Sequence, residues 1–154
     1  MIAPELAWQR LAEGLARGAT EARASSDRTV EEGGRMVTYW TGAALALEWD
    51  IGLRRATGGK DSLAQLLSRF AAKHLPAHNG WTAREFAQAL DRLAPAGLPH
   101  RYFIQTLERT LAQRGFPDHL GWFEIARVDP ATGRAKAAAP PELAALMQPW
   151  ARPE

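Results

Sequence analysis

The longest nearly apolar run in the chain, residues 36–60, constrains the fold more than any other feature. It reads MVTYWTGAALALEWDIGLRRATGGK and places apolar residues on almost every side of a helix. A helix of that kind is buried among other elements. The pair Gly58-Gly59 predicts where it ends, because glycine adopts the left-handed conformation of a helix C-cap at little cost. We therefore expect a buried central helix over residues 36–57.

Polar and small residues inside this run carry two further expectations. Asp50 and Arg54 lie one turn apart, in the order that suits an ion pair worth a few tenths of a kcal/mol. Gly42 costs a helix about 1 kcal/mol relative to alanine. We therefore expect either a close neighbour at Gly42 or a functional reason for a glycine there.

Amphipathic patterns predict further helices on both sides of the central run. The first covers residues 4–23, where Leu11 and Leu15 lie on one apolar stripe. Two of the later helices open with a capping-box pair, which satisfies the first free amides of a helix. The later helices are expected over residues 62–74, with the pair Ser62 and Gln65, 82–93, with the pair Thr82 and Glu85, 99–114 and 141–150.

The last part of the chain, residues 116–154, has a different character and an uncertain structure. Bulky apolar residues followed by the turn-forming stretch DPATG favour a small hairpin over residues 122–137. The expected fold is therefore mainly α, with five to six helices around the central helix and this hairpin. A length of 154 residues predicts a single domain over residues 1–154.

Composition excludes several classes of function. The chain has no cysteine, which rules out disulfides, thiol catalysis and cysteine-bound zinc. Its net charge is only +2, and acidic and basic residues alternate along the chain instead of forming a basic stripe. This arrangement argues against a nucleic-acid partner. The N-terminus has no signal-peptide pattern, and Glu48 and Asp50 make residues 36–53 too polar for a bilayer span. We expect a cytoplasmic protein, or one domain cut from a longer one, with no membrane contact. The sequence leaves its partner unknown, and the candidates are another protein or a second copy.

The histidines offer little support for a metal site. His74 and His78 have the four-residue spacing of two ligands on one helix face, but Pro76 lies between them. The HExxH zinc motif is absent, because no glutamate follows His74. The simpler interpretation puts His74 near a helix end and His78 in a loop, with His100 and His119 exposed.

Two other motifs invite functional readings that their spacing does not support. The TGGK stretch at 57–60 lacks the full spacing of a phosphate-binding loop and the strand before it, so we interpret it as a helix stop. Helices 62–74 and 82–93 could form a helix-turn-helix, but the connection between them is too long. The expected exposed residues of the second helix are also mixed in charge: Arg84, Gln88, Asp91 and Arg92.

Short motifs in the central third of the chain follow a recognisable order. They are Tyr39-Trp40-Thr41-Gly42-Ala43, Leu47, Asp50, Arg54, TGGK at 57–60, Ser62-Leu63, and Gly80, Thr82, Phe86 and Leu90. This order resembles the glycyl aminopeptidase family of zinc peptidases and, more distantly, the thermolysin-like aminopeptidases. The resemblance covers residues 36–93. It implies that the chain corresponds to the C-terminal helical part of the family's catalytic domain, downstream of the zinc helix.

The resemblance implies one site residue. In that family a tyrosine at the start of the buried helix donates a hydrogen bond to the oxyanion of the tetrahedral intermediate. By resemblance that role falls on Tyr39, in vestigial form, and a phenol aimed at developing negative charge suits it. The simpler interpretation is a core tyrosine with its hydroxyl at the rim.

The departures from the family concern the chemistry itself. Thr41 stands where the family has lysine, and neither HExxH nor the downstream glutamate ligand is found in the chain. Without two histidines and a glutamate, neither zinc nor an activated water is expected. Zinc is implied for the family only, and no cofactor is expected for this chain.

These observations leave three hypotheses. In the first, the chain is a non-catalytic helical domain that acts as a scaffold or interaction module. In the second, it is the helical portion of an active zinc aminopeptidase whose zinc-binding half lies upstream or on another chain. In the third, it is a small helical DNA-binding or regulatory protein unrelated to the peptidases.

Overall fold

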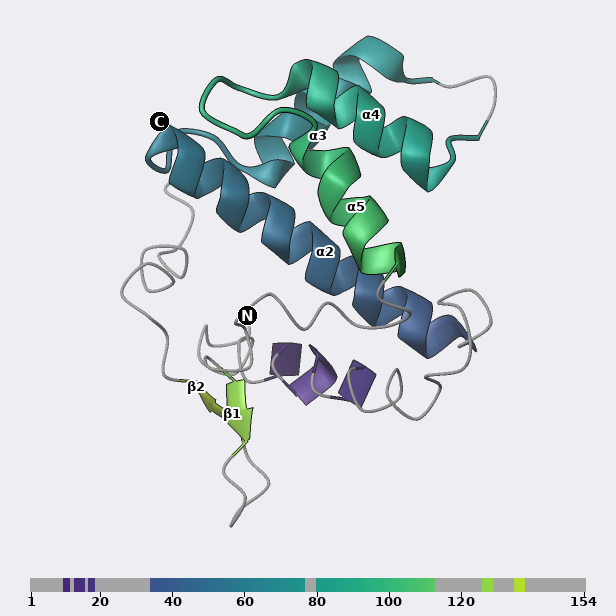
Figure 1. Cartoon of the computed structure of the whole chain (residues 1–154), viewed down its shortest axis with the longest axis vertical. Helices are drawn as coiled ribbons and strands as arrows, with labels where there is room; N and C mark the ends of the chain where they lie inside the picture. Colours follow the sequence, from purple (N-terminus) through teal and green to yellow (C-terminus); the bar gives the residue numbers. More distant parts are fainter. Residues whose placement is uncertain are drawn as a thin grey trace.

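The fold is mainly helical, as predicted (Figure 1). The structure is a computed structural model, and it describes residues 10–11, 13–15, 17–18, 34–76, 80–112, 126–128 and 135–137. The residues described between 10 and 18 are helical, and we call them the N-terminal helical segment. The helices that follow are α2 (Gly34–Thr57), α3 (Leu63–His74), α4 (Ala83–Leu93) and α5 (Tyr102–Ala112).

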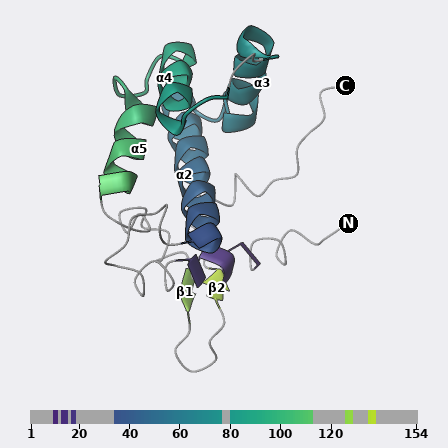
Figure 2. The same ribbon diagram turned by 90° about the vertical axis from the view of Figure 1, so that its right-hand side faces the viewer.

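Helix α2 is the central element, as its apolar sequence predicts. Helices α3, α4 and α5 gather toward its C-terminal end, and the N-terminal helical segment lies by its first half (Figure 2). One side of α2 nevertheless faces solvent. Its buried residues include Val37, Thr41, Ala44, Leu45, Trp49 and Leu53, whereas Thr38, Tyr39, Gly42 and Arg55 are exposed.

A main core joins the second half of α2 to α3, α4 and α5. Trp49 is central to it, because its ring lies 5.3 Å from that of Phe103 and 6.4 Å from that of Phe86, measured between centroids. The edge-on packing of Trp49 against Phe103 adds stability beyond the area it buries. The buried residues of the main core are Leu45, Trp49, Leu53, Leu66, Phe70, Ala87, Ala89, Leu90, Phe103, Ile104 and Leu107.

A separate small core joins the first half of α2 to the N-terminal helical segment. Its buried residues are Leu15, Val37 and Ala44, with Leu11, Trp40 and Leu47 packed against them. The predicted stripe of Leu11 and Leu15 is therefore confirmed. Because neither core includes a buried residue of the other, α2 is the helix that passes through both.

Helices α3 and α4 begin where their caps predict. The Ser62 hydroxyl accepts a hydrogen bond from the Gln65 amide, with 3.3 Å between oxygen and nitrogen. At α4 the capping box is complete, because the Thr82 amide donates to Glu85 Oε2 at 2.9 Å and the Glu85 amide donates to the Thr82 hydroxyl at 3.2 Å. The Thr82 amide and the Thr82 hydroxyl both donate to Glu85 Oε2, which favours the charged carboxylate and lowers the pKa of Glu85.

Helix α5 begins later than predicted. The expected start at Pro99 is wrong, because the helix begins at Tyr102 after Arg101 adopts the left-handed conformation with φ of 57°. A helix cannot extend backwards through such a residue. The helix is described to Ala112, and its predicted end at residue 114 lies outside the described residues.

Two short strands fall within the range predicted for a hairpin. Strand β1 (Ala126–Val128) pairs antiparallel with β2 (Ala135–Ala137), with Ala126 opposite Ala137. The helix predicted over residues 141–150 lies outside the described residues. None of the helices in the described part of the chain combines the length and the apolar character needed to cross a membrane.

Candidate functional site

Tyr39, the residue that the resemblance selects, lies on the outer side of α2. Its side chain is 64% exposed, so it is not a core tyrosine. Its ring stands edge-on to that of Trp40, with centroids 5.1 Å apart and an angle of 87° between the planes. From this position the phenol hydroxyl can donate a hydrogen bond to a group outside the chain. The Trp40 ring leaves most of Tyr39 exposed to water.

The next two residues turn inward. Thr41 is only 5% exposed, and Trp40 packs over Gly14 of the N-terminal helical segment. Both Trp40 Nε1 and Thr41 Oγ1 are buried, and neither has a hydrogen-bond partner among the residues that the structure describes. Lysine is almost never buried without a partner, so a neutral threonine fits this position better than the lysine of the family.

The close approach expected at Gly42 occurs instead at Gly52. Beyond the adjacent residues and backbone of its own helix, no atom of the described residues lies within 4 Å of the place where a Cβ on Gly42 would stand. At Gly52 a Cβ would overlap the phenol group of Tyr102, whose hydroxyl donates to the Glu48 carbonyl at 3.1 Å. Burial, and secondarily the Glu48 charge, raises the pKa of Tyr102 to about 12.

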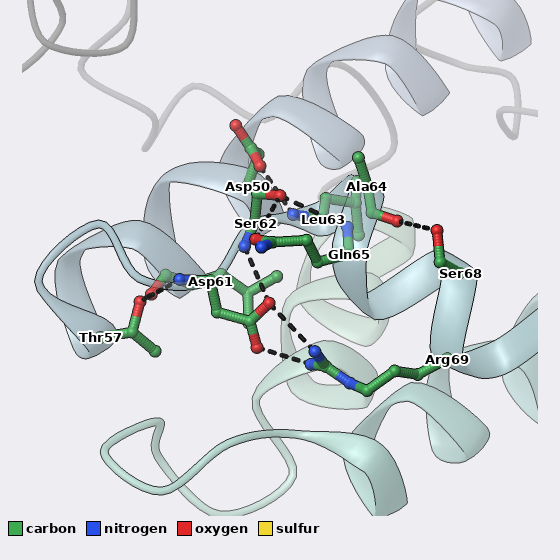
Figure 3. A network of polar contacts seen from close by, with 10 residues as sticks. Asp50, Thr57, Asp61, Ser62, Leu63, Ala64, Gln65, Ser68 and Arg69 are labelled. Atoms are coloured by element: carbon green, nitrogen blue, oxygen red, sulfur yellow. Dashed lines mark hydrogen bonds and ion pairs between the residues drawn. The ribbon is translucent and has the colours of Figure 1, made fainter. Parts of the chain in front are cut away.

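A network of polar contacts joins the end of α2 to the start of α3 (Figure 3). Asp50 Oδ2 accepts from Arg54 Nε at 2.8 Å, which confirms the predicted ion pair. Asp50 Oδ1 accepts from the Leu63 amide at 2.7 Å. A carboxylate on α2 therefore satisfies one of the free amides at the start of α3 and also suits the positive end of that helix.

The TGGK stretch forms the turn of this joint, as the predicted helix stop requires. Gly58 and Gly59 have φ of 62° and 82°, and the Gly59 amide donates to the Arg54 carbonyl at 2.7 Å. The Thr57 hydroxyl donates to the Leu53 carbonyl at 2.8 Å and accepts from the amide of residue 61 at 3.0 Å. These amides serve the turn, so they do not form a phosphate cradle.

Asp61 completes the joint with a salt bridge. Asp61 is only 9% exposed, and its carboxylate accepts from both terminal nitrogens of Arg69, at 3.2 and 2.5 Å. Asp61 Oδ1 also accepts from the Ser62 amide at 3.0 Å. A buried carboxylate held by a two-pronged arginine is well satisfied, so it stabilises the joint rather than standing ready for chemistry.

Asp91 has a similar role at the start of α5. Its Oδ1 accepts from the Phe103 amide at 3.0 Å and its Oδ2 from the Ile104 amide at 3.1 Å. The expectation that Asp91 is exposed is therefore wrong, because the residue is half-buried and its carboxylate caps the neighbouring helix. The sequence before α5, LPHR, offers no Ser, Thr, Asp or Asn as a cap, and that absence was the available signal.

The histidines do not assemble a metal site among the described residues. His74 ends α3, and its ring contacts those of Phe70 and Trp81 at centroid distances of 5.0 and 5.2 Å. The rings of Phe70 and Trp81 also contact each other, at 5.0 Å. His100 is exposed, as expected, whereas residues 78 and 119 lie outside the described residues. Within the described part of the chain, no three His, Cys, Asp or Glu residues are grouped so that they could hold a metal ion.

The exposed side of α4 is not a basic surface. Arg84 pairs with Glu108 of α5, and Gln88 and Arg92 are exposed. A face that reads DNA needs free positive charge directed toward phosphates. The described residues of α4 supply little of it.

Comparison with known proteins adds no relative: no protein-family model, no curated protein and no solved structure matches this chain. The resemblance to the glycyl aminopeptidase family therefore stays a prediction from the residues alone. The structure brings Asp50, Thr57, Asp61 and Ser62 together in one joint. Tyr39 stands apart from that joint, near the other end of α2.

Proposed function

We propose that this chain is a non-catalytic helical scaffold, a counterpart of the helical part of glycyl-aminopeptidase-like zinc peptidases without the zinc site. Its role would be to present a rigid helical surface to another protein. The observation that carries the proposal is that four polar residues of the family-like motifs, together with Asp61 beside them, hold the fold together; the four are Asp50, Arg54, Thr57 and Ser62. Asp50 and Asp61, the two carboxylates of the joint, are both occupied in this way.

The occupied carboxylates matter because catalysis needs available ones. A general base must reach a substrate proton, and a metal ligand must direct its lone pairs at the metal. Asp50 holds Arg54 and the α3 amide, and Asp61 holds Arg69 and its own neighbouring amide. Recruiting either group for chemistry would break the connection between α2 and α3.

A second function has one observation in its favour. The exposure of Tyr39 would let a separate zinc-binding half place a substrate oxyanion against its hydroxyl. In that case the chain would be the helical portion of an active zinc aminopeptidase. The DNA-binding alternative has less support, because Arg84 is paired and Asp91 caps α5.

The first experiment separates scaffold from enzyme. The purified chain is incubated with Zn²⁺ and with glycyl and alanyl p-nitroanilides, and release of nitroaniline is followed with and without EDTA. We expect no metal-dependent turnover. Turnover that zinc restores and EDTA removes would overturn the scaffold proposal.

The second experiment tests the two-chain enzyme. A neighbouring gene product that carries HExxH is added to the chain, and turnover of the mixture is compared for wild type and Tyr39→Phe. Tyr102→Phe is the matched control, because that hydroxyl is bonded inside the fold. A rate that falls only with Tyr39→Phe favours the two-chain enzyme over the scaffold. A salt-dependent shift of labelled duplex DNA would instead favour the third hypothesis.

A further inference from the structure

The connection between α4 and α5 (residues 94–101) packs against the C-terminal end of α2 (Figure 1). Gly97 lies so close to the last turn of α2 that a Cβ there would stand 2.9 Å from the Ala56 carbonyl oxygen. Tyr102, the first residue of α5, lies over Gly52 of the same helix. These two contacts bring the start of α5 to the end of α2.

Each of the stretches that meet there contributes exposed basic residues. They are Arg55 in the last turn of α2, Lys60 in the turn that follows, and His100 and Arg101 immediately before α5. We call these four residues the basic end. The stretches 51–60 and 92–101 include no aspartate or glutamate. Charges that alternate along the whole sequence are therefore separated at this end of the fold.

Three aspartates border these two stretches, and all three serve the fold. Asp50 pairs with Arg54, and Asp61 pairs with Arg69. Asp91 accepts from the first amides of α5. Each aspartate is buried or half-buried, and each charge is compensated by the group that it bonds. The charge that the basic end presents to solvent is therefore positive.

Arg101 has a backbone conformation that an arginine does not favour. Its φ of 57° lies in the left-handed region, which glycine and asparagine reach at the least cost. The neighbouring helix imposes this conformation, because the Arg101 carbonyl accepts from the Gln105 amide at 2.9 Å as α5 begins. Backbone strain at an exposed, charged residue is a reason to look for a function of its side chain outside the fold.

We propose that the basic end docks an acidic segment of a partner protein, with Arg101 as the anchor. A guanidinium group binds a carboxylate through two parallel hydrogen bonds, and the exposed ammonium group of Lys60 adds attraction at longer range. A nucleic-acid duplex fits less well, because it needs an extended row of phosphate contacts and these four residues form a compact group. The proposal rests on the scaffold function, for which it names the chemistry of the partner.

The first test compares two lysines. The probe is a fluorescein-labelled peptide of about ten glutamates, and fluorescence anisotropy follows its binding to the full chain in about 25 mM salt, where screening is weak. Lys60→Glu and Lys73→Glu change the net charge equally at exposed positions, and Lys73 lies near the far end of α3, about 18 Å along its axis. We expect Lys60→Glu to weaken binding about fivefold or more, and Lys73→Glu less than about twofold.

The second test separates binding from folding at Arg101. Arg101→Gly removes the charge and suits φ of 57°, so the urea midpoint of the variant should equal or exceed that of wild type. Binding of the glutamate peptide should nevertheless weaken about fivefold or more. A purely structural role of Arg101 would instead lower the urea midpoint and leave binding by the folded variant unchanged.

Three results would overturn the proposal. The first is no binding of the glutamate peptide to wild type, and the second is equal weakening by Lys60→Glu and Lys73→Glu, which would show a response to net charge alone. The third is tighter binding of a labelled DNA duplex that the same variants lose, which would assign the basic end to nucleic acid. Zinc-dependent turnover would overturn the scaffold function without changing these binding results, so the two failures can be told apart.

Discussion

The indole N–H of Trp49 donates to the hydroxyl of Thr106 across 2.6 Å, which links α2 to α5 inside the main core. The same hydroxyl lies 2.8 Å from the Tyr102 carbonyl and 3.0 Å from the Phe103 carbonyl, so it can accept from the indole and donate to its own helix. The small side chain of Thr106 therefore pairs the buried indole N–H of Trp49.

Replacing that hydroxyl should be expensive. Thr106→Val keeps the shape but leaves the Trp49 N–H buried and unpaired, so we expect a loss of about 1–3 kcal/mol in the free energy of unfolding. Urea denaturation measures it. Thr110→Val is the matched control, because Thr110 is equally buried and its one hydrogen bond among the described residues goes to the Thr106 carbonyl within its own helix. Equal losses for the two variants would contradict the special role of Thr106.

The cap that Asp91 gives to α5 can be tested in the same way. Asp91→Asn keeps one acceptor oxygen but removes the other and the charge, so α5 loses a bond at its positive end. We expect a loss of about 0.5–2 kcal/mol in the free energy of unfolding, measured by urea denaturation. Gln88→Ala, at an exposed position of the same helix, should change stability far less. A neutral Asp91→Asn would show that α5 needs no cap from α4.

Two glycines of α2 should respond in opposite directions to the same substitution. Gly42→Ala should stabilise the protein by about 0.5–1 kcal/mol, because the position is helical and exposed, and no described residue outside its own helix would meet the new methyl group. Gly52→Ala should destabilise it by about 1–3 kcal/mol, because the new methyl group collides with Tyr102. Thermal unfolding of the pair, compared with wild type, gives both signs. A destabilising Gly42→Ala would indicate that something in the molecule approaches this face after all.

The raised pKa of Tyr102 predicts a loss of stability in alkali. Its folded value of about 12 lies above the ordinary value of 10.0, so the folded state holds its proton more tightly than the unfolded chain does. The contribution is fully present below pH 10 and is lost as the pH rises through about 12. Urea midpoints of wild type and Tyr102→Phe are compared from pH 8 to 11.5. Wild type should lose stability relative to the variant above pH 10, and parallel profiles would contradict the prediction.

The variant also reports on the hydrogen bond itself. At neutral pH, Tyr102→Phe removes the donor to the Glu48 carbonyl and should cost about 1 kcal/mol. The difference between the two proteins should therefore be largest near neutral pH and shrink in alkali.

The sequence predicts a helix end where the residues that cap it lie beside it in the chain. Ser62 and Thr82 marked the starts of α3 and α4, and Gly58-Gly59 marked the end of α2, because each acts on backbone groups only a few residues away. The start of α5 could not be predicted in this way. Its amides are satisfied by Asp91, a residue of another helix, and only the packing of α4 against α5 brings that carboxylate near them.

The contacts of the candidate site also divide into local ones, which the sequence predicts, and ones that depend on how the helices pack, which it does not. The Asp50–Arg54 pair was predictable, because one turn of helix fixes its geometry. The bond from the Leu63 amide to Asp50 was not, because it depends on how the turn returns α3 to α2. Gly42 and Gly52 are indistinguishable by spacing within an apolar helix, and only the position of Tyr102 tells which one must stay small.

Helix α2 is a single uninterrupted helix of 24 residues, about 36 Å long, and it belongs to both cores. The direction in which the first half of α2 faces the small core is therefore fixed relative to the direction in which its second half faces the main core. One residue inserted between Ala44 and Trp49 would rotate the two cores against each other by about 100°, whereas seven residues would return them nearly to register. Length changes in this helix are thus tolerable only in near-whole turns, even at positions whose side chains contact nothing.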